Sequence, residues 1–156
     1  MEITNEVKSK FFPNGCNNCE ADIEHLSVFS ELEIYGKEYS DNPKSYWRCS
    51  KCSAHVSCHP DCITPAGVIA DKRVRAFRKR VHGLLDPIWK YYVKEQGMQK
   101  KEARPKAYQW LADKMELNKK DCHIGCFDEK QCIEAINILN EAYQKSASLR
   151  NFIKKS

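Results

Sequence analysis

Two Cys-x-x-Cys pairs, Cys16-Asn17-Asn18-Cys19 and Cys49-Ser50-Lys51-Cys52, dominate the N-terminal part of this 156-residue chain, with 29 residues between them. Two residues between paired cysteines let both sulfurs reach one ion from a tight turn. Four thiolates make a tetrahedral cage that suits Zn²⁺. We therefore predict that Cys16, Cys19, Cys49 and Cys52 hold one structural zinc ion. The alternatives are a redox dithiol and thiols that are unrelated to one another. A thioredoxin-type dithiol would require a βαβ context that the sequence does not show.

The cysteine content and the hydropathy indicate the compartment. The chain has nine cysteines, an odd number, and no charged, apolar and small-residue leader precedes the first of them. This favours a reducing cytoplasm, where thiols bind metal or pack as small apolar groups. No run approaches the roughly 18 apolar residues that a membrane-spanning helix needs. We expect a soluble cytoplasmic protein without a membrane partner.

Charge is distributed unevenly along the chain. Residues 1–43 contain nine acidic and three basic side chains, a net charge of −6, whereas residues 70–106 contain twelve basic and four acidic ones, a net charge of +8. This division predicts an anionic partner for the middle segment.

The hydrophobic pattern changes period near residue 65. Residues 26–35 alternate with a period of about two and predict a strand that ends at Gly36, and residues 45–48 and 54–57 predict two more strands around the second cysteine pair. Pairs of cysteines joined by short antiparallel strands are the layout of a zinc ribbon.

Helical periodicity follows, beginning near Asp71, a good N-cap residue. Asp86-Pro87 either starts a second helix or kinks the first, and Arg104-Pro105 starts another. Asp128 and Gln131 predict a capping box for the last helix. We predict an α+β fold, with a Cys₄ zinc ribbon at 1–64, a region of three to four helices at 65–145 and a polar tail at 146–156.

The first predicted helix is strongly basic. Lysine and arginine at this density can neutralise phosphates, and nearby aromatic rings can stack on unpaired bases. The candidate nucleic-acid-binding residues are Lys72, Arg73, Arg75, Arg78, Lys79, His82 and Trp89. We expect a nucleic-acid partner, DNA in preference to RNA. The alternatives are a solvated or internally docked helix face, and a protein-interaction module that uses Trp89, Tyr91 and the acidic N-terminal stretch.

Arg78, His82 and Asp86 stand four residues apart, so a carboxylate could orient an imidazole as in a general base. A nuclease-like enzyme is therefore a weaker alternative. No nucleophile, second carboxylate cluster or phosphate loop accompanies the three residues. A structural role for His82 between helices and a protein without catalytic activity fit the sequence better.

A second metal site is the last alternative. Further candidate ligands occur in two groups, one just after the ribbon and one near residue 124. They are His55, Cys58, His59 and Cys62, and Cys122, His123 and Cys126. Their spacing matches no familiar ligand pattern, and the simpler interpretation is that these thiols pack.

Several strings along residues 14–140 resemble those of a known family. They are Trp47-Arg48-Cys49-Ser50-Lys51-Cys52-Ser53-Ala54, Cys58-His59-Pro60, Pro65-Ala66-Gly67, Ala70-Asp71, Arg75, Arg78, His82, Asp86, Trp89, Ala107-Tyr108-Gln109-Trp110-Leu111-Ala112 and Cys122-His123-Ile124-Gly125-Cys126-Phe127-Asp128 with Cys132. In these the chain resembles the zinc-finger-containing domain family of phage and prophage proteins. The resemblance implies a zinc ribbon fused to helices, an origin in bacteria or their viruses, and no established reaction. With such an origin, the protein-interaction module of the alternative would dock a host enzyme or defence protein. The chain departs from common ribbons at Glu20 and Ser53, where a glycine or another small turn residue often follows the cysteine pair.

Overall fold

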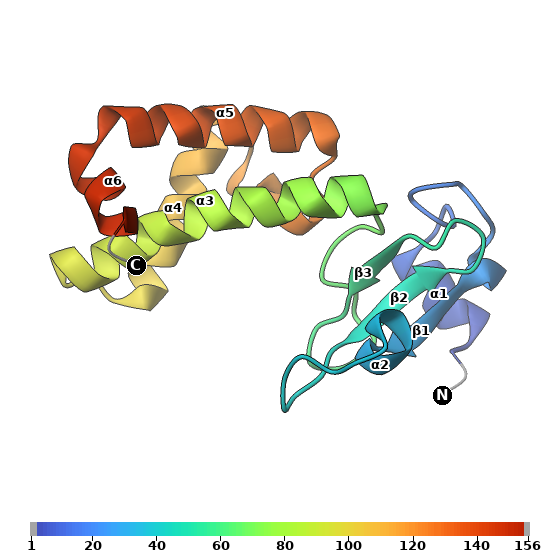
Figure 1. Cartoon of the computed structure of the whole chain (residues 1–156). Helices are drawn as coiled ribbons and strands as arrows, with labels where there is room; N and C mark the ends of the chain where they lie inside the picture. The colour runs from blue at the N-terminus through green and yellow to red at the C-terminus, as the bar shows by residue number, and fades with distance from the viewer. Residues whose placement is uncertain (1–2, 155–156) are drawn as a thin grey trace. The chain divides into compact units, whose positions relative to one another are not determined.

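A computed structural model describes residues 3–154 of the chain, with the backbone alone for Ile153. The chain divides into two compact units, residues 1–75 and 76–156, which are described separately below (Figure 1). A small antiparallel sheet occupies the first unit and helices form the second. The predicted α+β class, with the cysteine cluster in the N-terminal part, is confirmed.

The first unit is built on a three-stranded antiparallel sheet in the order β1-β2-β3, made of β1 (Leu26–Ser30), β2 (Ser45–Cys49) and β3 (His55–Ser57). Helix α1 (Asn5–Phe11) and a single 3₁₀ turn, η1 (Ile23–His25), precede the sheet. Trp47 lies at its centre, opposite Val28 on one side and Val56 on the other. Because side chains of residues directly opposite one another on adjacent strands point to the same face, these three residues share one face, which packs with the cysteine cluster.

The strand predicted for residues 26–35 is half wrong, because β1 ends at Ser30 and helix α2 (Glu31–Tyr35) follows. The Ser30 hydroxyl accepts from the backbone N–H of Glu33, and the Glu33 carboxylate accepts from the N–H of Ser30. This capping box satisfies two backbone N–H groups at the start of a helix. The helix therefore forms here, although the alternating apolar pattern of residues 26–35 favours a strand. Gly36, with a φ of +72°, ends the helix.

Helix α3 (Lys72–Gln96) runs from the end of the first unit into the second as one element. Asp71 caps it as predicted, since its carboxylate accepts from the N–H of Val74 at 2.9 Å. Pro87 lies inside the helix and neither ends it nor starts a new one, which excludes a second helix that begins at Asp86-Pro87.

The second unit has a continuous apolar core between α3, α4 (Lys100–Lys114) and α5 (Glu129–Lys145). The capping box of Asp128 and Gln131 is present as predicted. Two 3₁₀ turns, η2 (Lys119–Asp121) and η3 (Ile124–Cys126), link α4 to α5, and helix α6 (Ala147–Lys154) occupies most of the predicted polar tail. Helix α4 begins one turn before Arg104-Pro105, where the sequence predicts its start.

Candidate metal centre

The first cysteine pair lies on a tight turn that returns on itself. The N–H of Cys16 donates to the carbonyl of Ala21 at 2.8 Å, and the N–H of Glu20 donates to the carbonyl of Cys16 at 2.9 Å. Gly15 enters the turn with a φ of +77°, and Glu20 leaves it with a φ of +62°. The N–H of Asn18 points to the Cys16 sulfur at 3.4 Å. The turn therefore aims backbone donors at a sulfur that carries charge when metal is bound.

The second pair repeats this geometry. The N–H of Cys49 donates to the carbonyl of Ala54 at 3.0 Å, and the N–H of Ser53 donates to the carbonyl of Cys49 at 2.9 Å. Ser53, like Glu20, has a left-handed backbone, with a φ of +64°. The two departures from the common ribbon pattern thus occupy the positions where glycine would be unstrained.

The two turns bring the four sulfurs together. The Cys16 and Cys52 sulfurs are 3.8 Å apart, those of Cys19 and Cys49 are 3.7 Å apart, and all four lie within 4.8 Å of one another. A regular tetrahedron with Zn–S bonds of about 2.3 Å has edges of about 3.8 Å, whereas a disulfide requires about 2.05 Å. The four cysteines therefore form a site for one structural zinc ion, as predicted from their spacing.

The surroundings of the sulfurs affect their pKa values in opposite directions. Burial raises the pKa of the Cys16 thiol to about 12. Burial alone would also raise that of Cys52, but hydrogen bonds from the Ala54 backbone, from Asn18 and from neighbouring cysteines lower its pKa to about 7. Zinc binding must displace the thiol protons. Of these two ligands, Cys52 is therefore the easier to ionise, whereas Cys16 loses its proton only when the metal binds.

A family model for a zinc-finger-containing domain matches residues 13–142. The match includes all four cysteines and extends through most of the helical unit. The chain belongs to this family. No curated protein and no solved structure matches the chain.

The zinc-finger-containing domain has five further cysteines outside the site. Cys58, Cys122 and Cys132 are buried, while Cys62 and Cys126 are exposed. Within residues 3–154, the only group of three or more side chains that could hold a metal is the set of four cysteines described above. The second metal site weighed from the sequence therefore gains no support, and Cys132 packs in the helical core.

Aromatic and charged side chains gather on the sheet face opposite Trp47, a cluster that the sequence analysis missed. The buried His55 ring makes edge contacts with Tyr35 and Tyr46, and its Nε2 lies 3.0 Å from the Tyr35 hydroxyl. The Tyr46 hydroxyl donates to the buried carboxylate of Glu31 at 3.4 Å. Burial, reinforced by the nearby charge of Arg75, lowers the pKa of His55 to about 4. The period-two pattern could have placed Tyr46 and His55 on this face, but Glu31 and Tyr35 belong to the helix that was predicted as strand.

The predicted nucleic-acid-binding residues divide by exposure. Arg78 is buried, and its Nε–H donates to the carbonyl of Phe127 at 2.8 Å within the helical unit. Trp89 is also buried, and its indole N–H donates to Asp86 at 2.9 Å. Both side chains hold the fold, and neither is available for stacking or phosphate contact.

The other basic candidates lie nearer the surface. Arg75 is half-buried, and its guanidinium donates to the carbonyl of Ala70 at 2.6 Å. Lys72, Arg73 and Lys79 are exposed. Arg80 belongs to the same basic run but is not among the predicted binding residues, and it is exposed beside Lys79.

His82 is half-buried on α3, and burial lowers its pKa. Among the described residues it makes no hydrogen bond to Asp86, whose carboxylate accepts from Trp89 instead. The carboxylate-oriented imidazole that the sequence allowed is not assembled, so the geometry favours a structural role for His82.

No helix within residues 3–154 is both long and apolar enough to cross a membrane.

Proposed function

We propose that this zinc-finger-containing domain is a non-enzymatic protein that binds nucleic acid, DNA in preference to RNA, through the first half of α3. The observation that carries the proposal is the exposure of Lys72, Arg73, Lys79 and Arg80 on one helix. They belong to the segment of net charge +8, residues 70–106. Such a surface attracts phosphates and releases counterions when it binds them.

The spacing of these side chains suits a phosphate backbone. Lys72 and Lys79 are seven residues apart, so they lie on the same side of the helix, about 10 Å apart along its axis. Ala76 and Gly83, which are exposed on this side, are too small to obstruct the approach of a ligand. Neither residue therefore blocks phosphate contacts with Lys72 and Lys79 on this side of the helix.

Zinc has a supporting role in this proposal. Four thiolates saturate a tetrahedral ion and leave no open position for a substrate or an activated water. The metal holds the two cysteine turns together and so fixes the first unit, where α3 begins. The resemblance to phage and prophage proteins supports a phage or prophage origin and a place in the cytoplasm of a bacterial host, and we include both in the proposal.

Fluorescence anisotropy with a labelled DNA duplex at several salt concentrations tests the proposal, with single-stranded DNA and duplex RNA as comparison ligands. We expect the Lys72→Ala, Arg73→Ala, Lys79→Ala, Arg80→Ala quadruple variant to lose most of the affinity. The slope of log K against log salt should fall in magnitude by about 3 to 4, because each duplex phosphate contact contributes about 0.9.

The matched control carries the same charge change on other exposed lysines. They are Lys114, Lys119, Lys120 and Lys130, each replaced by Ala. An equal loss in both variants, or no binding at low salt, would overturn the proposal.

A second candidate, a protein-interaction module, is favoured by one observation in the first unit. Leu32, Tyr35 and Tyr39 are exposed by 52%, 44% and 62%, beside the acidic Glu33 and Glu38. Exposed apolar side chains close in sequence to carboxylates fit a basic protein segment better than a nucleic acid. Pull-down from nuclease-treated bacterial lysate with wild type and Tyr39→Ser separates the candidates, since only a protein partner would be lost with Tyr39.

A further inference from the structure

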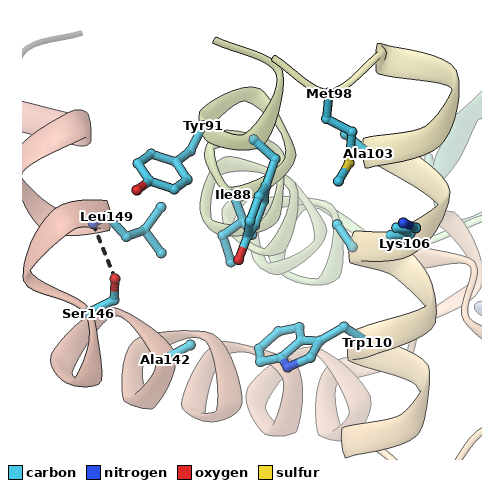
Figure 2. A pocket seen from close by; sticks show the side chains of 11 residues that line it. Ile88, Tyr91, Met98, Ala103, Lys106, Trp110, Ala142, Ser146 and Leu149 are labelled. Carbon is cyan, nitrogen blue, oxygen red and sulfur yellow. Dashed lines mark hydrogen bonds between the residues drawn. The ribbon is translucent and has the colours of Figure 1, made fainter. Parts of the chain in front are cut away.

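The helical unit contains a cavity of about 400 Å³ that the proposed function does not use. Its wall comes from the second half of α3, from α4, and from the junction of α5 and α6, with Ile88, Tyr91, Lys106, Trp110, Ala142 and Leu149 among its lining residues (Figure 2). Small-molecule sites in proteins have volumes of roughly 300–1,000 Å³. The cavity is therefore large enough for a ligand and not merely a packing defect.

The lining is mostly apolar and aromatic. Trp110 and Tyr91 present their rings to the cavity, and Ile88 and Leu149 supply aliphatic surface (Figure 2). Ser146 also lines it, but its hydroxyl already accepts from the N–H of Leu149 at 3.2 Å. The interior thus suits a ring system that needs few hydrogen bonds.

Charge narrows the class of ligand further. Lys106 is the only charged residue among the described residues that line the cavity, and no carboxylate lines it. Its ammonium pairs with Glu102 at 3.0 Å, but the two side chains are exposed by 64% and 53%. Exposed pairs of this kind contribute little free energy, so an anionic ligand group can replace Glu102 at low cost.

We propose that this cavity binds a small, flat aromatic molecule that carries one negative charge. The ring system lies against Trp110 and Tyr91, and the carboxylate or sulfonate pairs with Lys106 at the mouth. In the part of the chain that the structure describes, no carboxylate lines the cavity to pair with a cationic ligand, and a neutral ligand makes no ion pair with Lys106. The cavity shares none of the exposed basic residues proposed to bind nucleic acid, so either proposal can fail without the other.

Two dyes that differ by one charged group test the proposal: 8-anilinonaphthalene-1-sulfonate and its neutral analogue N-phenyl-1-naphthylamine. The site-specific readout is the indole ¹H–¹⁵N resonance of Trp110, assigned by Trp110→Phe. The Trp47 indole, which donates to the Ile63 carbonyl at 2.6 Å in the other unit, is the internal reference. We expect the sulfonate to shift the Trp110 resonance saturably at micromolar concentrations and to leave that of Trp47 in place.

Two variants with matched controls test the parts of the proposal separately. Lys106→Gln should weaken sulfonate binding about two- to fivefold and leave the neutral dye unaffected, as expected for an exposed ion pair of up to about 1 kcal/mol. Ala142→Phe should fill the cavity and weaken both dyes at least tenfold. The matched controls are Lys130→Gln and Ala147→Phe, at exposed positions that do not line the cavity. They should leave the binding of both dyes unchanged.

Circular dichroism spectra identical to the wild type confirm that each variant folds. A Trp110 resonance that does not move, binding that does not saturate, or full binding by Ala142→Phe would overturn the site. An equal loss of both dyes in Lys106→Gln would overturn the assigned charge.

Discussion

Gly15 occupies the most constrained backbone position of the first cysteine turn. A Cβ placed on it would lie 2.2 Å from the carbonyl oxygen of Ala21, whereas one on Gly36 would have nothing within 4 Å. Both glycines have a positive φ, of +77° and +72°. Replacing Gly36 therefore tests backbone strain alone, whereas replacing Gly15 tests the same strain together with a steric clash.

We predict that Gly15→Ala destabilises the zinc-loaded protein by about 3 kcal/mol or more, because a backbone carbonyl must move. Gly36→Ala should cost only about 1–2 kcal/mol for its left-handed conformation. Denaturant unfolding measures the free energy of unfolding of both variants, and zinc content after gel filtration shows whether each still holds the metal. Equal costs in the two variants would contradict the clash.

Glu20 and Ser53, which follow the two cysteine pairs, have a left-handed backbone, and replacing them with glycine should raise stability. Glu20→Gly and Ser53→Gly should each stabilise the first unit by about 0.5–1 kcal/mol, because the relieved strain exceeds the entropy that glycine adds to the unfolded chain. Thermal unfolding of the zinc-loaded variants measures the effect. Asp22→Gly, at an exposed position with a φ of −57°, is the control and should be destabilising. A loss of stability in Glu20→Gly and Ser53→Gly would contradict the argument.

His55 makes the stability of the first unit depend on pH. Its pKa is lowered to about 4 in the folded protein from 6.5, so the unfolded chain takes up a proton first as the pH falls. The contribution of neutral His55 is complete above pH 6.5 and is lost between pH 6.5 and 4, with a loss of roughly 2 kcal/mol by pH 5. Urea unfolding at pH 7.5 and pH 5 measures it.

His55→Gln is the matched comparison, because glutamine can still bond to the Tyr35 hydroxyl but does not titrate. Protonation of the zinc-binding cysteines affects both proteins alike, so the difference between them isolates His55. Identical pH dependence in the two proteins would contradict the assignment.

At the scale of single elements, α2 shows where sequence patterns compete. Leu26 to Ser30 alternate as a strand should, and the sequence predicts β1 correctly up to that point. The continuation fails because a local capping box between Ser30 and Glu33 starts a helix, and a five-residue helix is too short to show its own period. The four cysteines were predictable because their spacing alone limits the geometry of the ligands.

Helix α3 shows the opposite difficulty, because charge does not reveal exposure. Arg78 and Lys79 are neighbours in a basic run, yet one is buried against the Phe127 carbonyl and the other is exposed. Helical spacing places Arg78 on the buried face of Val81 and Leu85. The position of the Phe127 carbonyl, 49 residues further along the chain, explains how a guanidinium is accommodated there.

We predict that Arg78→Met destabilises the helical unit by about 2–3 kcal/mol, because the Phe127 carbonyl loses a charged donor in a buried place. Lys79→Met should change stability by less than about 0.5 kcal/mol. Chemical denaturation monitored by far-UV circular dichroism compares the two variants. A larger loss in Lys79→Met would contradict the structural role of Arg78.

On the scale of the whole molecule, the two units have separate cores. Trp47, Phe12 and Leu26 pack with the cysteine cluster in the first, while Leu85 and Leu139 pack in the second. The cavity of the second unit could not be predicted, since its lining comes from four helices whose packing no local pattern encodes.

We predict that chelation of zinc unfolds the first unit and leaves the helical unit folded, because metal-binding free energy supports only the core that contains the ligands. In ¹H–¹⁵N spectra the Trp47 indole resonance should move to its unfolded position while those of Trp89 and Trp110 persist. Readdition of zinc should return the Trp47 resonance to its position in the folded protein. Simultaneous loss of all three resonances would show that the units unfold as one.

The distribution of the thiols outside the metal site has a practical consequence. Cys62 in the first unit and Cys126 in the second are exposed, while zinc protects its four ligands and the other three thiols are buried. Maleimide reagents should therefore attach at two defined places, one on each unit, without engineered cysteines. The wild-type chain is thus ready for paired spin labels or dyes, which would report the separation of its two units in solution and any change in that distance when a ligand binds.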